Sequence, residues 1–372
     1  MKVLMQCIYF PPEVGGLESH VFYLCRELVT LGHDVTMVTS RSKPGVPKRE
    51  TMDGIRVIRT WFPSRNPIGW MAHTAGSTAA YLREAKQATI LHAQTFASAP
   101  PAILASARGG QPLVLTLHTS HFLRLARKPL WQPVLRRLIR AADWLLAASE
   151  ELRDVALRLY PHPRAEALTN GVDTNLFVAV EPAMPRRAGT YRVIVPRRLF
   201  EKNGVEYFLR AMPRIREGED VEALIVGDGP LRARLERLAR ELGIANVVTF
   251  AGARPNIEMP GILSSGDMVV IPSLMEATSV AALEAMACER PVAASRVGGL
   301  PEIVDESVGT LFEPADPEDM ARHVLSLLRR QDRAGMGEKA RARVVQRWSL
   351  ARLARRHVEI YEQLLRERGA PA

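Results

Sequence analysis

The amino-acid sequence predicts an α/β protein made of two doubly wound domains in tandem. Three observations predict this class. The chain has 372 residues, more than one hydrophobic core usually supports. Short apolar runs alternate with amphipathic segments through both halves, a pattern typical of parallel sheets built from strand–helix–strand units. An irregular, proline-containing stretch at residues 178–190 separates the halves and is expected to be the linker.

The first domain is expected to cover residues 1–177. Its expected strands are "KVLMQCIYF", "HDVTMVTS", "ILHAQ", "LVLTLH" and "WLLAAS", and the first two flank a helix at "LESHVFYLCRELVTLG". No run of about 18 apolar residues occurs, and the apolar start passes into "PPEVGG" without a cleavage-site pattern. Neither a membrane span nor a signal peptide is therefore expected.

The same alternation restarts beyond the linker and predicts a second domain over residues 191–347. Its expected strands are "YRVIVPRRL", "VEALIVGDG", "VVTFAG", "DMVVIPS" and "PVAAS". Helices are expected at "GVEYFLRAMPRIRE", "PLRARLERLARELG" and "VAALEAMAC". Residues 348–372 predict a long amphipathic helix, because apolar positions recur three and four apart. This helix is expected to pack back towards the first domain.

The charge is unevenly distributed. The chain carries a formal net charge of +10, and residues 1–177 hold 21 Lys and Arg against 13 Asp and Glu. This surplus suggests a polyanionic partner, although a solvated basic face without any partner is the alternative. The cysteines Cys7, Cys25 and Cys288 are too scattered for a disulfide framework or a zinc cluster. A reducing, cytoplasmic location is therefore expected.

Two glutamates stand eight positions apart in "SLMEATSVAALEAMACERPVAASRVGGLPE". Glu276 follows an expected strand, and Glu284 falls inside the next helix. Open parallel sheets bind ligands beyond the carboxyl ends of their strands. There, Thr278, Ser279 and Val280 would open the helix and present free N–H groups to a phosphate. Glu284, about two turns along, would accept hydrogen bonds from ribose hydroxyls, with Glu276 on a sugar.

This Glu-x7-Glu element, followed by "VGGLPEIV", resembles the signature of the retaining nucleotide-sugar glycosyltransferases of family 4. The resemblance covers most of the chain. It extends to "PPEVGGLESHV", "TLHTS", "TNGVDTNLF", "PRRLFEKNGVEYFLRAM", "VGDGPLR" and "FAG". It implies the GT-B fold, in which two Rossmann-like domains face each other across a cleft. It also implies transfer of a sugar from a UDP-sugar or GDP-sugar to an acceptor hydroxyl on a glycan or a lipid-linked molecule, without a separate cofactor.

The resemblance implies roles for charged residues of the second domain. Glu276 would act at the donor sugar, and Arg198 and Lys202 would neutralise the charge that develops on the leaving diphosphate. No Asp-x-Asp motif is present, so the cations must come from the protein and no metal is expected. The nucleotide pocket is expected to include Gly227, Gly252, Ala253 and Arg254.

The sequence departs from the family pattern at two places. The family often has a lysine directly before the glycine of the phosphate loop. Here "EKNG" puts Asn203 in that place and Lys202 before it. Many members have Phe-Gly where this chain has Thr278 and Ser279, so the resemblance does not fix the shape of the donor-sugar pocket and implies no particular sugar.

The resemblance also implies functional residues in the first domain. Gly15 and Gly16 open a helix, where the absence of a Cβ lets backbone N–H groups approach a donor closely. His118 ends the strand "LVLTLH" and would line the cleft near the sugar, where it could orient a hydroxyl. The alternative for His118 is a hydrogen-bonded, buried histidine.

Residues 121–143 form a basic segment with interleaved apolar side chains. Its cations are Arg124, Arg127, Lys128, Arg136, Arg137 and Arg140. This pattern suits an anionic membrane surface, so peripheral attachment to the inner face of the membrane is expected and nucleic acid is not. The alternative is a helix that packs on the sheet and exposes a solvated basic face.

Two other functions remain open from the sequence. A sugar-nucleotide epimerase of the same fold would rearrange the donor sugar instead of transferring it. A basic membrane-binding or polyanion-binding module with a vestigial site would account for the charge, but it leaves the two glutamates and Arg198 without a purpose.

Overall fold

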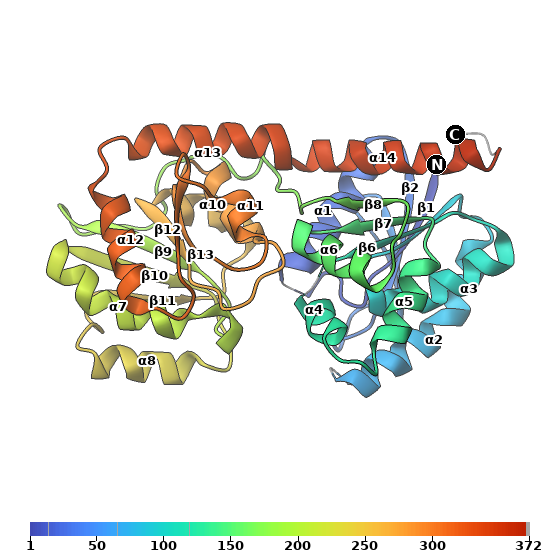
Figure 1. Ribbon diagram of the computed structural model, residues 1–372, viewed down its shortest axis with the longest axis horizontal. Coiled ribbons are helices and arrows are strands. Elements are labelled where there is room, and N and C mark those ends of the chain that lie inside the picture. Colours follow the sequence, from blue (N-terminus) through green and yellow to red (C-terminus); the bar gives the residue numbers. More distant parts are fainter. Residues whose placement is uncertain (14, 65, 119, 370–372) are drawn as a thin grey trace. The chain divides into compact units, whose positions relative to one another are not determined.

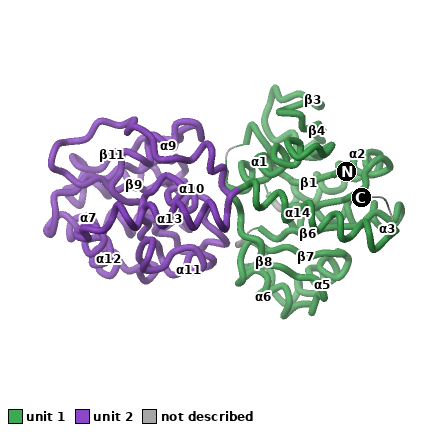
Figure 2. Tube along the Cα trace, turned by 90° about the horizontal axis from the view of Figure 1, so that it is seen from above, with its two compact units in different colours: residues 1–171, 350–372 green, residues 172–349 purple. Residues whose placement is uncertain are grey.

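A computed structural model describes residues 1–369 except 14, 65 and 119. The chain forms two compact units (Figure 2). Unit 1 is Met1–Gly171 together with the C-terminal segment from Leu350 on, and unit 2 is Val172–Ser349. Each unit contains a sheet covered by helices on both faces (Figure 1). The predicted fold class, two doubly wound α/β domains, is confirmed.

Unit 1 contains an eight-stranded sheet in the order β3-β4-β2-β1-β5-β6-β7-β8, parallel except for the antiparallel pair β3 and β4. Its strands are β1 Lys2–Gln6, β2 Asp34–Ser40, β3 Arg49–Met52, β4 Ile55–Thr60, β5 Ile90–Ala93, β6 Leu113–Leu117, β7 Trp144–Ala147 and β8 Ala165–Ala167. Its helices are α1 Gly16–Thr30, α2 Pro67–Ala85, α3 Ala99–Gly109, α4 Ser120–Ala126, α5 Gln132–Arg140, α6 Glu150–Leu159 and α14 Leu350–Glu367, with the short 3-10 helix η1 Phe96–Ser98.

Unit 2 contains a six-stranded, fully parallel sheet in the order β11-β10-β9-β12-β13-β14. Its strands are β9 Tyr191–Pro196, β10 Val221–Val226, β11 Val248–Gly252, β12 Met268–Ile271, β13 Val292–Ser295 and β14 Gly309–Phe312. Its helices are α7 Val205–Gly218, α8 Arg232–Glu241, α9 Met259–Ser264, α10 Val280–Ala287, α11 Leu300–Ile303, α12 Pro317–Arg329 and α13 Arg333–Trp348, with the 3-10 helices η2 Glu201–Asn203 and η3 Asn256–Glu258.

Alternation along the central strand β9 builds the two cores of unit 2. Val193 and Val195 are buried against α7, α8 and α12 on one face, and Ile194 is buried against α9, α10 and α13 on the other. Successive side chains of a strand point to opposite faces, and both faces of a parallel sheet are covered by helices. The strand therefore consists of buried apolar residues over most of its length.

The boundary between the units differs from the predicted one. The first domain is expected to end at residue 177, but Val172 and Phe177 are buried in a core of unit 2. The expected linker, 178–190, also packs on unit 2. The N–H of Ala183 donates to the carbonyl of Gly261 at 2.9 Å, and the guanidinium of Arg192 donates to the carbonyl of Met184 at 2.9 Å. Hydrogen bonds to backbone carbonyls, which leave no apolar pattern in the sequence, hold this stretch in place.

The C-terminal helix α14 belongs to unit 1. Its apolar side chains share one core with α1 and with the strands β1 and β2. The buried α14 residues include Leu353, Ile360, Tyr361 and Leu364.

Among the described residues, every helix is too short or too polar to span a lipid bilayer. Cys7, Cys25 and Cys288 are buried free thiols.

Candidate active site

The loops that follow β9 and β12 bring a charged cluster to the carboxyl edge of the unit 2 sheet. Arg197 comes directly after β9, and its Nη2 donates to Glu276 Oε2 at 2.6 Å and to Ser279 Oγ at 3.2 Å. Ser273 Oγ also donates to Glu276 Oε2, at 3.4 Å. The side chains of Arg197 and Glu276 are only 10% and 17% exposed. A largely desolvated ion pair therefore stands at the edge where such sheets bind ligands.

Arg197 was not among the residues expected from the sequence to be functional. Its Nε is buried and has no hydrogen-bond partner among the described residues. Arg197 and Arg198 stand side by side after the same strand, and a pattern of residue types does not distinguish them. The only sequence signal for Arg197 is its place directly after a buried strand.

Ser279 begins helix α10. Its side chain accepts a hydrogen bond from the N–H of Ala282 at 3.3 Å, which is the usual role of a serine at an N-cap. The N–H groups of Val280 and Ala281 lie in the first turn of α10, where no carbonyl of the helix can accept them. Together with the helix dipole, they favour binding of an anion at this end of the helix. Thr278 is 7% exposed, and its Oγ1 has no partner within the described chain.

Glu284 lies on the second turn of α10. Burial raises the pKa of its carboxyl to about 8, and the nearby Arg197 guanidinium opposes this rise. In the absence of a ligand, most Glu284 carboxyls are therefore protonated at neutral pH. Hydroxyl donors from a bound ribose would favour the ionised form, because hydrogen bonds to a carboxylate stabilise its charge.

The raised pKa of Glu284 predicts a stability that falls as pH rises. The folded state holds the extra proton from the ordinary glutamate pKa of 4.5 up to about 8, so the free energy of unfolding declines across this window and then levels off. Glu284→Gln removes this effect. Its melting temperature relative to wild type is expected to increase steadily between about pH 5.5 and about pH 8.5. The exposed helix residue Glu338 provides the control, and a Glu338→Gln variant that showed the same trend would contradict the assignment.

The phosphate-loop residues take different positions. Arg198 is exposed, and its guanidinium lies 5.6 Å from the centre of the Phe200 ring. Asn203 is 6% exposed and donates from Nδ2 to the carbonyl of Arg198 at 2.6 Å. Lys202 has an exposed side chain, and its carbonyl accepts the N–H of Leu274 at 2.8 Å. Asn203 therefore fixes the loop from inside, while the two cations lie on its outer surface.

Close backbone approaches lock the site loops together. A Cβ on Gly298 would lie 1.8 Å from the carbonyl oxygen of Glu276, and Gly298 has a φ of +55°. Only glycine accepts both the approach and this conformation without strain. Gly227 approaches the Arg197 carbonyl in the same way, and its N–H donates to the Gly252 carbonyl at 2.8 Å. Gly298 and Gly227 thus hold the backbone beneath the Arg197–Glu276 pair.

The remaining predicted nucleotide-pocket residues lie at the end of β11. Ala253 and Arg254 are exposed, directly after Gly252. The Nε of Arg254 donates back to the carbonyl of Ala251 at 3.1 Å. The structure therefore brings Gly252 next to Gly227, and it leaves Ala253 and Arg254 at the surface beyond them.

The predicted residues of unit 1 lie at the start of α1 and the end of β6. Gly15 precedes the first turn of α1, and Gly16 is its first residue. His118 is 7% exposed; its Nδ1 lies 3.1 Å from Asn170 Oδ1 and its Nε2 lies 2.8 Å from Gln94 Oε1. Burial lowers the pKa of His118 to about 3. These contacts are those of the alternative expected from the sequence, a buried, hydrogen-bonded histidine, and the role of His118 near a sugar stays a prediction.

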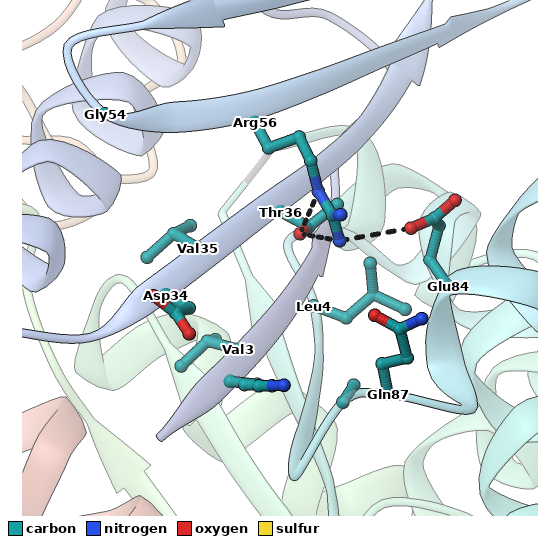
Figure 3. A pocket seen from close by; sticks show the side chains of 11 residues that line it. Val3, Leu4, Asp34, Val35, Thr36, Gly54, Arg56, Glu84 and Gln87 are labelled. Atoms are coloured by element: carbon teal, nitrogen blue, oxygen red, sulfur yellow. Dashed lines mark hydrogen bonds and ion pairs between the residues drawn. The ribbon is translucent and has the colours of Figure 1, made fainter.

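A separate hollow of about 270 Å³ lies at the amino ends of β1 and β2 (Figure 3). Arg56 donates from Nη2 to Thr36 Oγ1 at 2.9 Å and to Glu84 Oε2 at 3.1 Å there. Because ligands of such sheets bind at the opposite, carboxyl edge, this hollow is not part of the candidate site.

Within the described residues, no cluster of three or more His, Cys, Asp or Glu could hold a metal ion.

Comparisons with known proteins agree across both units. Residues 14–176 match a family described as Glycosyltransferase Family 4, and residues 190–330 match one described as Glycosyl transferases group 1. A phosphatidylinositol N-acetylglucosaminyltransferase chain of Arabidopsis thaliana is 28% identical over 87% of this chain and 73% of its own. A GDP-mannose-dependent alpha-(1-6)-phosphatidylinositol monomannoside mannosyltransferase of Mycolicibacterium smegmatis is 29% identical over 91% of this chain and 92% of its own.

Two solved structures share the fold. The sucrose-phosphate synthase of Thermosynechococcus elongatus has a TM-score of 0.85 at 22% identity, covering 98% of this chain and 99% of that one. HepE of Anabaena, in complex with UDP and glucose, has a TM-score of 0.77 at 20% identity, covering 97% of this chain and 99% of that one.

Proposed function

Because the chain belongs to the family 4 (group 1) glycosyltransferases, which use nucleotide-sugar donors, we propose that it transfers a sugar to an acceptor hydroxyl with retention of configuration. One observation carries this proposal. The desolvated pair of Arg197 and Glu276 stands beside the N-terminus of α10, so one small region offers a carboxylate, a cation and free N–H groups. These are the groups that a sugar diphosphate requires.

We assign the donor groups to this region as follows. The first N–H groups of α10 receive a phosphate, Glu284 accepts hydrogen bonds from the ribose, and Glu276 faces the sugar. Backbone groups at Gly252 and beyond receive the base. The exposed cations Arg198 and Lys202 neutralise the diphosphate as it leaves, in place of a metal ion. In unit 1, we assign Gly15 and Gly16 to donor binding through the backbone N–H groups at the start of α1.

A panel of donors tests this proposal. UDP-, GDP- and ADP-sugars are screened by thermal shift in excess chelator, and the donor that binds is then assayed with glycan and lipid-linked acceptors. We expect one nucleotide class to stabilise the chain and the product to keep the donor's anomeric configuration. Free epimerised sugar without acceptor would instead support the epimerase. Failure of every donor to bind would leave only a polyanion-binding module. Activity lost in chelator and restored by magnesium would overturn the metal-independent assignment.

We also propose that the acceptor is linked to a lipid and that unit 1 attaches to an anionic membrane surface. On α5, Leu135 and Ile139 are buried and the other face carries the cations. Beside them, Leu130 is 90% exposed, Trp131 40% and Val134 47%. Exposed apolar side chains next to basic ones suit an interface with anionic headgroups. Two relatives have names that include phosphatidylinositol, which supports the same class of acceptor.

Attachment predicts sedimentation with anionic vesicles at low salt, and weaker sedimentation at high salt because the Debye length shrinks. The charge reversals Arg137→Glu and Arg140→Glu on α5 are expected to abolish it. Arg237→Glu and Arg240→Glu provide a matched control, because these are also exposed arginines three positions apart, on α8 of unit 2. Equal losses from both pairs, or no vesicle binding by the wild type, would favour the solvated basic face and a soluble acceptor.

A further inference from the structure

The side chain of Arg197 links the loop that carries Glu276 to the N-terminus of α10. One end of its guanidinium contacts the carboxylate of Glu276 at 2.6 Å and the N-cap hydroxyl of Ser279 at 3.2 Å. Its backbone is fixed as well, since a Cβ on Gly227 would lie 2.2 Å from the Arg197 carbonyl oxygen. Arg198, one residue along, is exposed and lies over the Phe200 ring. The two arginines therefore have different surroundings.

We propose that Arg197 is a positioning residue, which holds the Glu276 carboxylate and the first turn of α10 in one arrangement for donor binding and transfer. This inference rests on the proposed function, because Glu276 needs a fixed position only if it acts on a substrate. Arg197 then works through Glu276 and Ser279, whereas Arg198 works on the diphosphate directly.

Charge and burial support this division. A carboxylate that is only 17% exposed is costly to leave without its counter-charge, so loss of Arg197 is expected to displace Glu276 towards solvent. The guanidinium also opposes the effect of burial on the pKa of Glu284. Removing Arg197 therefore raises the pKa of Glu284 further and keeps that carboxyl protonated to higher pH.

Lysine is expected to replace Arg197 only in part. Nη2 of the guanidinium reaches both Glu276 and Ser279, and the planar group presents its donors in a fixed geometry. The ammonium of lysine is a compact charge on a flexible stem. Lysine thus keeps the charge beside Glu276 and Glu284 but weakens the link to the N-cap.

A double-mutant cycle tests the proposal by kinetics. Arg197→Met is expected to lower kcat at least about tenfold with a smaller change in the donor KM, because misplacement of a reacting group affects mainly the transition state. In a Glu276→Gln background, Arg197→Met is expected to have a smaller further effect than in wild type, because the part that acts through that carboxylate is already lost. Arg197→Lys is expected to recover part of kcat.

Arg198→Met provides the matched control. It removes the same charge one residue along, and its effect is expected to multiply with that of Glu276→Gln, because the two groups act separately. Effects of Arg197→Met and Glu276→Gln that multiply independently would overturn the proposal. So would an Arg197→Lys variant as impaired as Arg197→Met.

A second measurement uses the chain without any ligand. The melting temperature of Glu284→Gln relative to its parent is followed against pH in wild type, Arg197→Met and Arg198→Met backgrounds. Arg197→Met is expected to extend the pH-dependent difference to higher pH, and Arg198→Met is expected to leave it unchanged. If no donor is turned over, the proposed function fails, and this measurement then tests the part of the inference that needs no donor, namely that the Arg197 guanidinium acts on Glu284 and the Arg198 guanidinium does not. An unchanged profile in Arg197→Met would refute that part.

Discussion

Glu276→Ala is expected to lower the turnover number by at least about a hundredfold, the scale found when one preorganised charged group is removed from a polar transition state. Two effects combine in this variant. The carboxylate that we assign to the sugar is lost, and Arg197, only 10% exposed, loses its counter-charge. The melting temperature is expected to fall as well, because a largely buried cation is left without its partner.

The measurement is initial-rate kinetics with the donor that the panel identifies. Glu217→Ala is the control, because Glu217 also forms an ion pair, with Arg214, but its side chain is 63% exposed. Exposed pairs of this kind contribute little, so we expect turnover within about twofold of wild type. Near-normal turnover in Glu276→Ala would show that the carboxyl edge of unit 2 is not the active site.

Gly298→Ala is the second variant expected to have a large effect. Its new Cβ would overlap the carbonyl oxygen of Glu276 at 1.8 Å, and φ at this position is +55°. The backbone of either loop must move, so we expect a loss of about 2 to 4 kcal/mol in stability. Turnover is expected to fall together with it, because the movement displaces the carboxylate that we assign to the sugar.

Gly243→Ala is the control that separates the cost of a positive φ from the cost of steric overlap with a neighbouring backbone. Gly243 has a φ of +67°, but a Cβ there would have nothing within 4 Å. It therefore measures the conformational cost alone, about 1 to 2 kcal/mol, and is expected to leave turnover unchanged. Thermal unfolding and kinetics on both variants decide the point. Equal destabilisation in the two would mean that the loops below Glu276 are not tightly packed.

Most of the fold could be predicted because its central strands are apolar runs between amphipathic helices. Strands of mixed polarity could not. β8 consists of "AEA" and β14 of "GTLF", and neither is an apolar run. Their positions depend on pairing with β7 and β13, which is a tertiary contact rather than a local preference.

The candidate site shows the same division. Glu276, Ser279 and Glu284 could be placed on one strand end and one helix, because both elements have strong local signals. The choice between Arg197 and Arg198 could not be made, since it depends on how the backbone turns after β9 and on the close approach of Gly227. For His118, the partners Gln94 and Asn170 come from distant segments that no spacing connects.

Unit 1 is built from two segments of the chain that are separated by all of unit 2, and this affects the order in which the units fold during synthesis. During translation all of Val172–Ser349 leaves the ribosome before α14 does, so unit 2, which is contiguous, can finish folding first. Unit 1 cannot complete its core until α14 has been synthesised, because Ile360 and Tyr361 of α14 are part of that core. Closing that core brings together segments separated by an entire folded unit. Contacts between segments distant in sequence slow folding. Unit 1 is therefore the unit whose apolar core residues stay exposed longer, to chaperones and to aggregation.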